Sequence, residues 1–288
     1  MRLGFWRLRN TFLGLLLLIL PGCAALAVDP YQAADQLAAA RGFSKRYLEA
    51  GAFRLLSYQR FTAPGQAVTV YLEGDGAAWL TRSRISTDPT PRQPLVLELA
   101  ALDPAANVAY LARPCQFVLR EGLGEGCEPA LWSSARFGEA VVESLDRGLD
   151  SVLLASGAAQ LHLIGYSGGG ALAVLAAARR DDVVSLRTIA GNLDHRRFTG
   201  HHRVTPLRDS LNPSDMATVV DKIPQLHFVG GEDAIVPALV AESFLNQQGP
   251  ANCAELVRVE GVGHQRGWLA VWPDLLRTIL PCSAEAGP

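Results

Sequence analysis

The chain has 288 residues, of which 49% are hydrophobic and 19% charged, and its formal net charge at pH 7 is −2. A chain of this length and composition can bury a large core within one domain. Because the charge is close to neutral and the few basic clusters lack interleaved aromatic residues, the sequence argues against a nucleic-acid partner.

Residues 1–22 have the pattern of a signal peptide. Arg2, Arg7 and Arg9 precede an apolar stretch at 12–20 that is too short to cross a bilayer as a helix. We therefore leave this segment out of the fold prediction and expect the chain to be exported.

Two processing routes after this segment stay open. Leu20-Pro21-Gly22-Cys23 resembles a bacterial lipobox, in which Cys23 becomes the lipidated first residue, whereas Ala25-Leu26-Ala27 fits ordinary secretory cleavage. We favour the lipoprotein route, although Pro21 is unusual in a lipobox. The expected location is then the bacterial outer membrane or periplasm, and a secreted protein is the alternative. Because one acyl chain binds a membrane only marginally, an anchor at Cys23 should carry more than one chain.

Either route leaves the remaining cysteines in the mature chain, namely Cys115, Cys127, Cys253 and Cys282. Four cysteines in an exported chain predict two disulfides, with buried free thiols as the alternative. The sequence permits three connectivities, and pairing 115 with 127 and 253 with 282 closes the shortest loops.

Strand-like and helix-like segments alternate along most of the chain. A helical stretch at 31–41 comes first. The predicted strands are 53–61, 68–72, 108–111, 161–165, 185–190, 226–229 and 256–259. The predicted helices between and after them are 95–102, 137–154, 171–180, 239–247 and 268–280. This alternation predicts an α/β fold with a mostly parallel sheet and helices on both faces, and functional residues gather at the carboxyl edge of such a sheet.

Two segments interrupt the alternation. Residues 81–94 are rich in proline and read as a loop. Residues 192–223 are longer than a plain connection, and we expect them to form a small cap over the sheet. No shift in composition marks a second domain, so residues 23–288 are predicted to be a single domain.

The clearest chemical signal is Gly165-Tyr-Ser167-Gly-Gly169, which follows an apolar strand and opens a helix. The two flanking glycines permit the tight turn that presents a serine hydroxyl at its apex. Ser167 is the predicted nucleophile. The N–H of Gly168, at the start of the helix, can stabilise a developing oxyanion.

A serine needs a base and an acid that follow it in the chain, each at the end of its own strand. Asp233 follows the strand 226–229 and is the predicted acid, although a helix-capping role is the alternative for it, and Asp194 is a rival. His264 follows the strand 256–259 and is the predicted general base. Histidines in the cap lie near Asp194 without the spacing of a metal site, so we expect no metal and no cofactor.

The second oxyanion donor should come from the loop after the strand 68–72. Its sequence is Glu73-Gly74-Asp75-Gly76, where we take the N–H of Asp75 as the first candidate and that of Gly76 as the second. Two carboxylates beside a site of developing negative charge are unusual. We expect these side chains to turn away, toward arginines such as Arg82 or Arg113.

Together, the motifs around Ser167, Asp233 and His264 resemble the nucleophile, acid and histidine motifs of the α/β-hydrolase superfamily, over roughly residues 68–280. The segments 73–76 and 112–115 resemble those of bacterial members. The resemblance implies a mostly parallel sheet of about eight strands with the active site at its carboxyl edge.

The expected function is hydrolysis of carboxylic esters of small molecules through an acyl-enzyme. A thioesterase or peptidase would use the same residues. The alternative from another class is a non-catalytic envelope lipoprotein that uses the scaffold for binding. Besides the ester substrate, we expect a membrane as a partner, bound through a lipid anchor at Cys23. The sequence does not indicate an oligomeric state.

Overall fold

The computed structural model describes residue 1 and residues 29–282. All of the predicted signal peptide 1–22 except residue 1 lies outside the described residues, as do the predicted lipidation site Cys23 and the alternative cleavage motif at 25–27. Within the described part of the chain, no helix combines the length and apolar character needed to cross a membrane.

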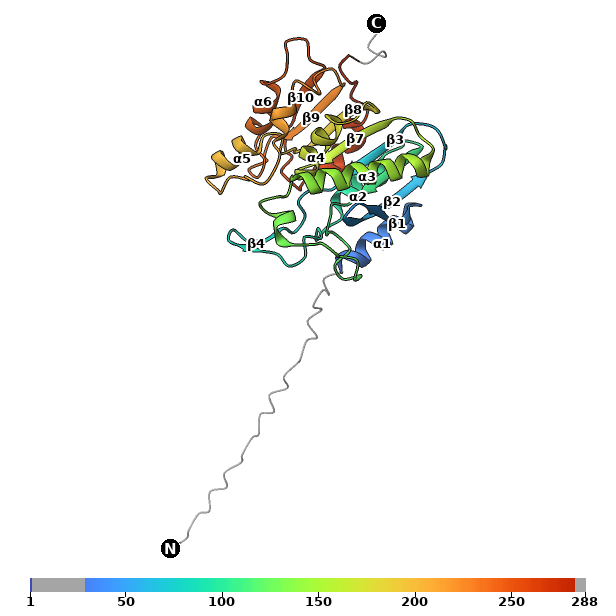
Figure 1. Ribbon diagram of the computed structural model, residues 1–288. Coiled ribbons are helices and arrows are strands. Elements are labelled where there is room, and N and C mark those ends of the chain that lie inside the picture. Colours follow the sequence, from blue (N-terminus) through green and yellow to red (C-terminus); the bar gives the residue numbers. More distant parts are fainter. Residues whose placement is uncertain (2–28, 283–288) are drawn as a thin grey trace.

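Eight strands form one mostly parallel sheet (Figure 1) in the order β1-β2-β6-β3-β7-β8-β9-β10. Strand β2 runs antiparallel to both β1 and β6, and the remaining neighbours pair in parallel. The strands are β1 Ser44–Ala50, β2 Phe53–Phe61, β3 Val68–Leu72, β6 Asn107–Leu111, β7 Leu161–Tyr166, β8 Val183–Ile189, β9 Gln225–Gly230 and β10 Ala254–Val259. A separate two-stranded ribbon is formed by β4 Trp79–Thr81 and β5 Arg84–Ile85.

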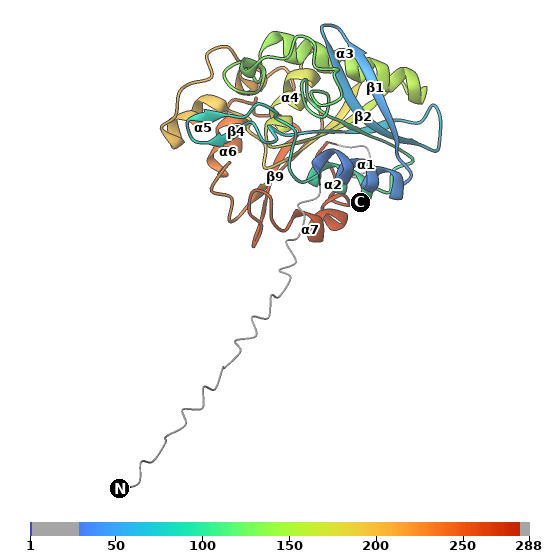
Figure 2. The same cartoon turned by 90° about the horizontal axis from the view of Figure 1, so that it is seen from below.

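The central strands are apolar on both faces because helices cover both sides of the sheet (Figure 2). In β3, Val68, Val70 and Leu72 pack into one core cluster with helices α3, Glu139–Ser156, and α4, Gly168–Ala177. Tyr71 of the same strand points to the opposite cluster, formed with α1, Pro30–Ala40, α2, Leu95–Leu102, and α7, Trp268–Leu275. Helix α6, Leu239–Leu245, contributes to the first cluster.

The segment predicted to form a cap contains two short helices. They are α5, His195–His202, and the 3-10 helix η2, Pro213–Met216, and a second 3-10 helix, η1, covers Pro129–Trp132. Asp194 begins α5 by accepting hydrogen bonds from the backbone N–H groups of Arg196 and Arg197. Helix α5 lies against α6, and η2 lies against α4 and α6.

All seven predicted strands lie in the main sheet, whereas β1 was not predicted, and neither was the ribbon β4–β5, whose second strand lies within the predicted loop 81–94. Strand β1 lies at the sheet edge and buries only its last residue, Ala50, and its sequence Ser-Lys-Arg-Tyr-Leu-Glu-Ala is too polar to show a buried face. It is held by antiparallel pairing to β2, which the sequence pattern of the segment itself does not reveal.

The structure contains two disulfides, which join Cys115 to Cys127 and Cys253 to Cys282. The first closes the long connection between β6 and α3. The second ties the residue before β10 to the chain that follows α7.

Candidate active site

Ser167 occupies a sharp turn between β7 and α4. Its backbone lies in the left-handed region, with φ 53° and ψ −118°, a conformation that costs energy for a non-glycine residue. The flanking glycines allow the close packing of this turn. A Cβ at Gly165 would lie 2.2 Å from the carbonyl oxygen of Gly169, and a Cβ at Gly169 would lie 2.3 Å from that of Leu72. The Gly165-Tyr-Ser-Gly-Gly169 motif therefore needs glycine at both ends, because backbone atoms of neighbouring segments leave no room for a Cβ there.

Two residues from distant parts of the chain meet Ser167. The Nε2 of His264 lies 3.1 Å from the Oγ of Ser167, and its Nδ1 lies 2.8 Å from the Oδ2 of Asp233. The Asp233 side chain is fully buried and that of His264 is 13% exposed. With the ring proton on Nδ1, directed at the carboxylate, Nε2 is left to accept the proton of the hydroxyl.

The second carboxylate oxygen of Asp233 fixes the orientation of that side chain. Its Oδ1 accepts hydrogen bonds of 2.8 Å from the backbone N–H groups of Ile235 and Val236. Asp233 thus shapes its own turn and still offers Oδ2 to His264. The rival Asp194 has other partners: besides capping α5, it accepts hydrogen bonds from Asn212 and Ser243.

Two aromatic side chains that the sequence analysis did not single out hold the histidine loop. The hydroxyl of Tyr166 and the Nε1 of Trp268 both donate to the carbonyl oxygen of His264, at 3.0 and 2.9 Å. The rings of Tyr166 and His264 also lie 5.3 Å apart. A signal was present in the sequence, because Tyr166 directly precedes Ser167 and Trp268 follows His264 by four residues.

The loop of residues 73–76, which follows β3, packs directly against the nucleophile turn. A Cβ at Gly74 would lie 3.0 Å from the Tyr166 ring and 3.3 Å from the Cβ of Ser167. The N–H of Gly74 is occupied, because it donates to the Oε1 of Glu73 at 2.8 Å. Among the hydrogen bonds of residues 29–282, none uses the N–H of Asp75 as a donor. That N–H is therefore available to an oxyanion, as is the N–H of Gly168, which opens α4 and has no intrahelical acceptor.

The carboxylate of Asp75 lies between two arginine side chains. It forms salt bridges with Arg113 and Arg136, and the Oδ2 to Nη1 distance to Arg136 is 2.7 Å. Of the two arginines expected from the sequence, Arg113 pairs with Asp75 and Arg82 does not. The second partner, Arg136, was not predicted. Although burial alone would raise it, the pKa of Asp75 is held below its usual value by Arg136 and Arg113. The carboxylate thus stays ionised and charge-compensated beside the nucleophile turn.

Glu73 is buried beneath the same loop. Its Oε2 accepts a hydrogen bond of 2.9 Å from the hydroxyl of Tyr110, and Oε1 accepts the N–H of Gly74. Burial raises the pKa of this carboxyl to about 7. The side chain therefore turns away from Ser167, as expected, but toward a tyrosine instead of an arginine.

No group of three or more His, Cys, Asp or Glu side chains in the described residues is arranged to hold a metal ion. In the cap, His195 is buried and its ring stacks on Phe137, whereas the rings of His201 and His202 contact each other.

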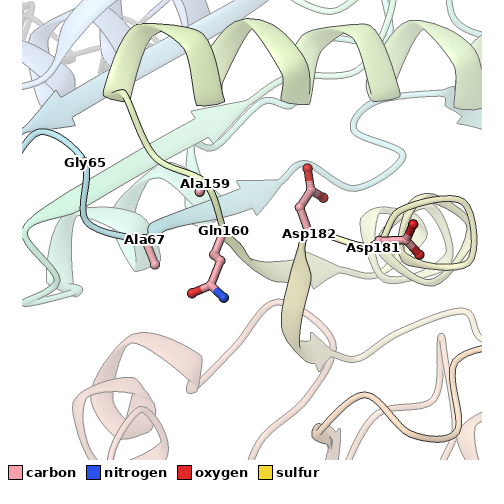
Figure 3. A pocket seen from close by; sticks show the side chains of 6 residues that line it. All are labelled: Gly65, Ala67, Ala159, Gln160, Asp181 and Asp182. Atoms are coloured by element: carbon pink, nitrogen blue, oxygen red, sulfur yellow. The ribbon is translucent and has the colours of Figure 1, made fainter.

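A surface pocket of about 380 Å³ lies at the opposite edge of the sheet (Figure 3). Its lining residues precede the amino ends of β3, β7 and β8, whereas Ser167, Asp233 and His264 follow the carboxyl ends of β7, β9 and β10. The lining contains no hydroxyl, thiol or imidazole: it consists of Gly65, Ala67, Ala159, Gln160, Asp181 and Asp182. This pocket therefore offers no serine, cysteine or histidine for the predicted chemistry, and the candidate site remains at the carboxyl edge.

No protein-family model matches the chain, and no curated protein matches it. Solved structures do. Est1E of Butyrivibrio proteoclasticus with bound ferulic acid superposes with a TM-score of 0.58 at 15% identity, covering 81% of this chain and 96% of that one. The esterase Pf2001 of Pyrococcus furiosus gives 0.58 at 12% identity, covering 81% and 86%. Dienelactone hydrolase of Anabaena variabilis gives 0.53 at 17% identity, covering 82% and 95%. Likeness at these identities is evidence of architecture, and together with the sheet described above it shows that this chain has the α/β-hydrolase fold.

Proposed function

We propose that the protein is a serine hydrolase that cleaves carboxylic esters through an acyl-enzyme. Ser167 is the nucleophile, His264 the general base and then the general acid, and Asp233 the acid that orients the ring. The observation that carries the proposal is the continuous chain from Ser167 Oγ to His264 Nε2, 3.1 Å, and from His264 Nδ1 to Asp233 Oδ2, 2.8 Å.

The reaction proceeds in two halves. The Oγ of Ser167 attacks the ester carbonyl while Nε2 of His264 takes the hydroxyl proton, and the buried carboxylate of Asp233 stabilises the imidazolium that forms. The tetrahedral oxyanion is held by the N–H groups of Gly168 and Asp75. Collapse expels the alcohol, which receives the proton from His264. A water molecule activated by the same base then releases the acid and restores the serine.

The names of the structural relatives favour an ester over a thioester or an amide. One is an esterase and one a dienelactone hydrolase, and both names refer to cleavage of a carboxylic ester or its cyclic form. We carry this chemistry to the present chain as part of the proposal, because the fold by itself accommodates all three bond types.

The direct test uses a fluorophosphonate probe, which forms a covalent bond with an activated serine. Wild-type protein should be labelled and Ser167→Ala should not, while both keep the same melting temperature. Equal labelling of the two proteins would exclude Ser167 as the nucleophile. A well-folded protein that is not labelled and cleaves neither short-chain nor long-chain p-nitrophenyl esters would favour the non-catalytic binding role instead.

We further propose that the mature chain is one exported domain, which is anchored to the membrane through Cys23. The two disulfides support an oxidising compartment. Incorporation of radiolabelled palmitate by the wild type and its loss in Cys23→Ala would support the anchor. Absence of incorporation in the wild type would exclude it and leave ordinary secretory cleavage.

A further inference from the structure

A second loop, residues 113–117 after β6, supports the 73–76 loop at two points. The guanidinium of Arg113 forms a salt bridge with the Asp75 carboxylate. The Nε2 of Gln116 donates to the carbonyl oxygen of Gly74 at 2.9 Å, and its Oε1 accepts the N–H of Arg113 at 3.1 Å. Both side chains are almost completely buried, at 3% and 1% exposed. Neither side chain has a place in the proposed chemistry, so their burial in this position calls for another role.

The backbone on either side of Gln116 is strained. Cys115 and Phe117 have φ values of 73° and 59°, the left-handed region that non-glycine residues rarely adopt. Such strain persists only where the surroundings determine the conformation, and it is concentrated at functional sites. Here the surroundings include the disulfide from Cys115 to Cys127 and a hydrogen bond of 2.8 Å from the N–H of Phe117 to Thr90.

The bond to Gly74 has a specific geometric consequence. The carbonyl oxygen of Gly74 and the N–H of Asp75 belong to one planar trans peptide unit, so they point in opposite directions. By holding that oxygen, Gln116 sets the direction of the Asp75 N–H. Arg113 holds the same residue through its side chain, and the Asp75 carboxylate lies against Gly168, where a Cβ would be 2.1 Å from Oδ1.

We propose that Gln116 and Arg113 are positioning residues for the oxyanion hole, which hold the Asp75 peptide N–H in the direction needed to bind the tetrahedral intermediate. This inference rests on the proposed function and extends it. Arg113 has a second effect in the same position. It compensates the negative charge of a carboxylate that would otherwise oppose the developing oxyanion.

The test compares Gln116→Glu and Gln116→Met with the wild type. Glutamate places an oxygen against the Gly74 carbonyl, and methionine removes the donor without adding charge. Loss of an oxyanion donor costs about 10²–10³-fold in kcat, and misplacement by about 1 Å about 10²-fold, so we expect kcat on p-nitrophenyl butyrate to fall about 10–100-fold with KM within about threefold. The second-order rate of fluorophosphonate labelling should fall by the same factor, because the phosphonyl oxygen occupies the same hole.

Matched controls separate positioning from stability. Gln59→Glu changes a buried glutamine on β2 whose side chain donates to Ser57, and it should keep kcat. Arg113→Met removes the cation beside Asp75 and should lower kcat. Arg113→Lys keeps a cation there and should retain most of the wild-type kcat. Arg180→Met removes a buried arginine paired with Asp146 and Asp182, and should lower the melting temperature without lowering kcat of the folded protein.

The outcomes distinguish this inference from the proposed function. Wild-type kcat and labelling rate in both Gln116 variants would overturn the positioning role while leaving the hydrolase intact. A fall that appears only as a higher KM, or that follows the unfolded fraction at the assay temperature, would also overturn it. If the wild type is neither labelled nor active, the proposed function fails first and this inference with it.

Discussion

Replacing Asp233 by asparagine tests the orientation of the histidine, because the structure decides how the new amide would sit. The Oδ1 position accepts two backbone N–H groups, from Ile235 and Val236, each at 2.8 Å. An amide NH₂ in that position would leave two buried donors unpaired, at roughly 1–3 kcal/mol each. The amide oxygen must therefore keep the Oδ1 position, and the NH₂ group must face Nδ1 of His264.

This orientation reverses the ring tautomer. The NH₂ group of the introduced asparagine would donate to Nδ1, so the ring proton moves to Nε2, which lies 3.1 Å from the Ser167 hydroxyl. Nε2 then has no lone pair for the serine proton. A wrong tautomer at this position costs about 10⁴-fold in kcat, equivalent to about 5 kcal/mol of transition-state stabilisation. Because the two backbone hydrogen bonds survive, the melting temperature should change little.

The assay is steady-state hydrolysis of p-nitrophenyl butyrate by Asp233→Asn, with the melting temperature measured on the same sample. Asp194→Asn is the matched control, since Asp194 caps α5 and bonds Ser243 instead of a histidine. It should keep kcat within about threefold and lose at most about 1 kcal/mol of stability. A variant Asp233→Asn that retains more than a tenth of wild-type kcat would refute the reasoning, and a larger loss in Asp194→Asn would make Asp194 the acid.

Three further predictions concern stability. Gly165→Ala should destabilise the protein by about 3 kcal/mol or more in urea unfolding, because its Cβ would lie 2.2 Å from the Gly169 carbonyl oxygen. The control is Gly200→Ala in α5, whose Cβ meets nothing within 4 Å and which should be neutral or stabilising. Equal effects of the two substitutions would contradict the close packing of the turn. Burial raises the pKa of Glu73 to about 7 from 4.5, so between these pH values the folded carboxyl keeps a proton that the unfolded one loses. The protonated side chain therefore contributes roughly 3 kcal/mol to the free energy of unfolding, which should be present below pH 4.5 and disappear as the pH rises to about 7. Glu73→Gln should remove that slope from unfolding free energies measured across this range, and an unchanged slope would assign it to other groups. Removing the bond between Cys253 and Cys282, which are 29 residues apart, by the double alanine variant should cost about 2–4 kcal/mol of unfolding free energy, and stability equal to the wild type would show that the bond does not constrain the unfolded chain.

Much of the fold could be predicted from the sequence because the signals are local. Buried strands such as 68–72 and 161–165 are apolar runs bounded by glycine or polar residues, and the helices between them show their periodicity directly. The edge strand β1 escaped prediction because its stability comes from pairing with β2 and leaves little mark in its own residue pattern.

The candidate site divides in the same way. Ser167, Asp233 and His264 could be named from the sequence, since each follows a strand at a glycine-containing turn and the chain order is that of the resembled superfamily. Arg136 and Gln116 could not be named. Both lie in the long connection between β6 and α3, whose residue pattern contains no sign that it reaches the 73–76 loop.

The sequence by itself determined the succession of elements, the serine turn and the positions of an acid and a histidine at strand ends, because periodicity and glycine-containing turns act over a few residues. Tertiary structure decided the partners. Only the order and parallel direction of the strands bring the carboxyl ends of β7, β9 and β10 close together. His264 therefore meets Asp233, whereas Asp194 caps a helix. Likewise, only the folded chain places Arg113 and Arg136, instead of Arg82, around Asp75. Contacts between residues far apart in the chain depend on the packing of the whole sheet, and no short segment encodes them.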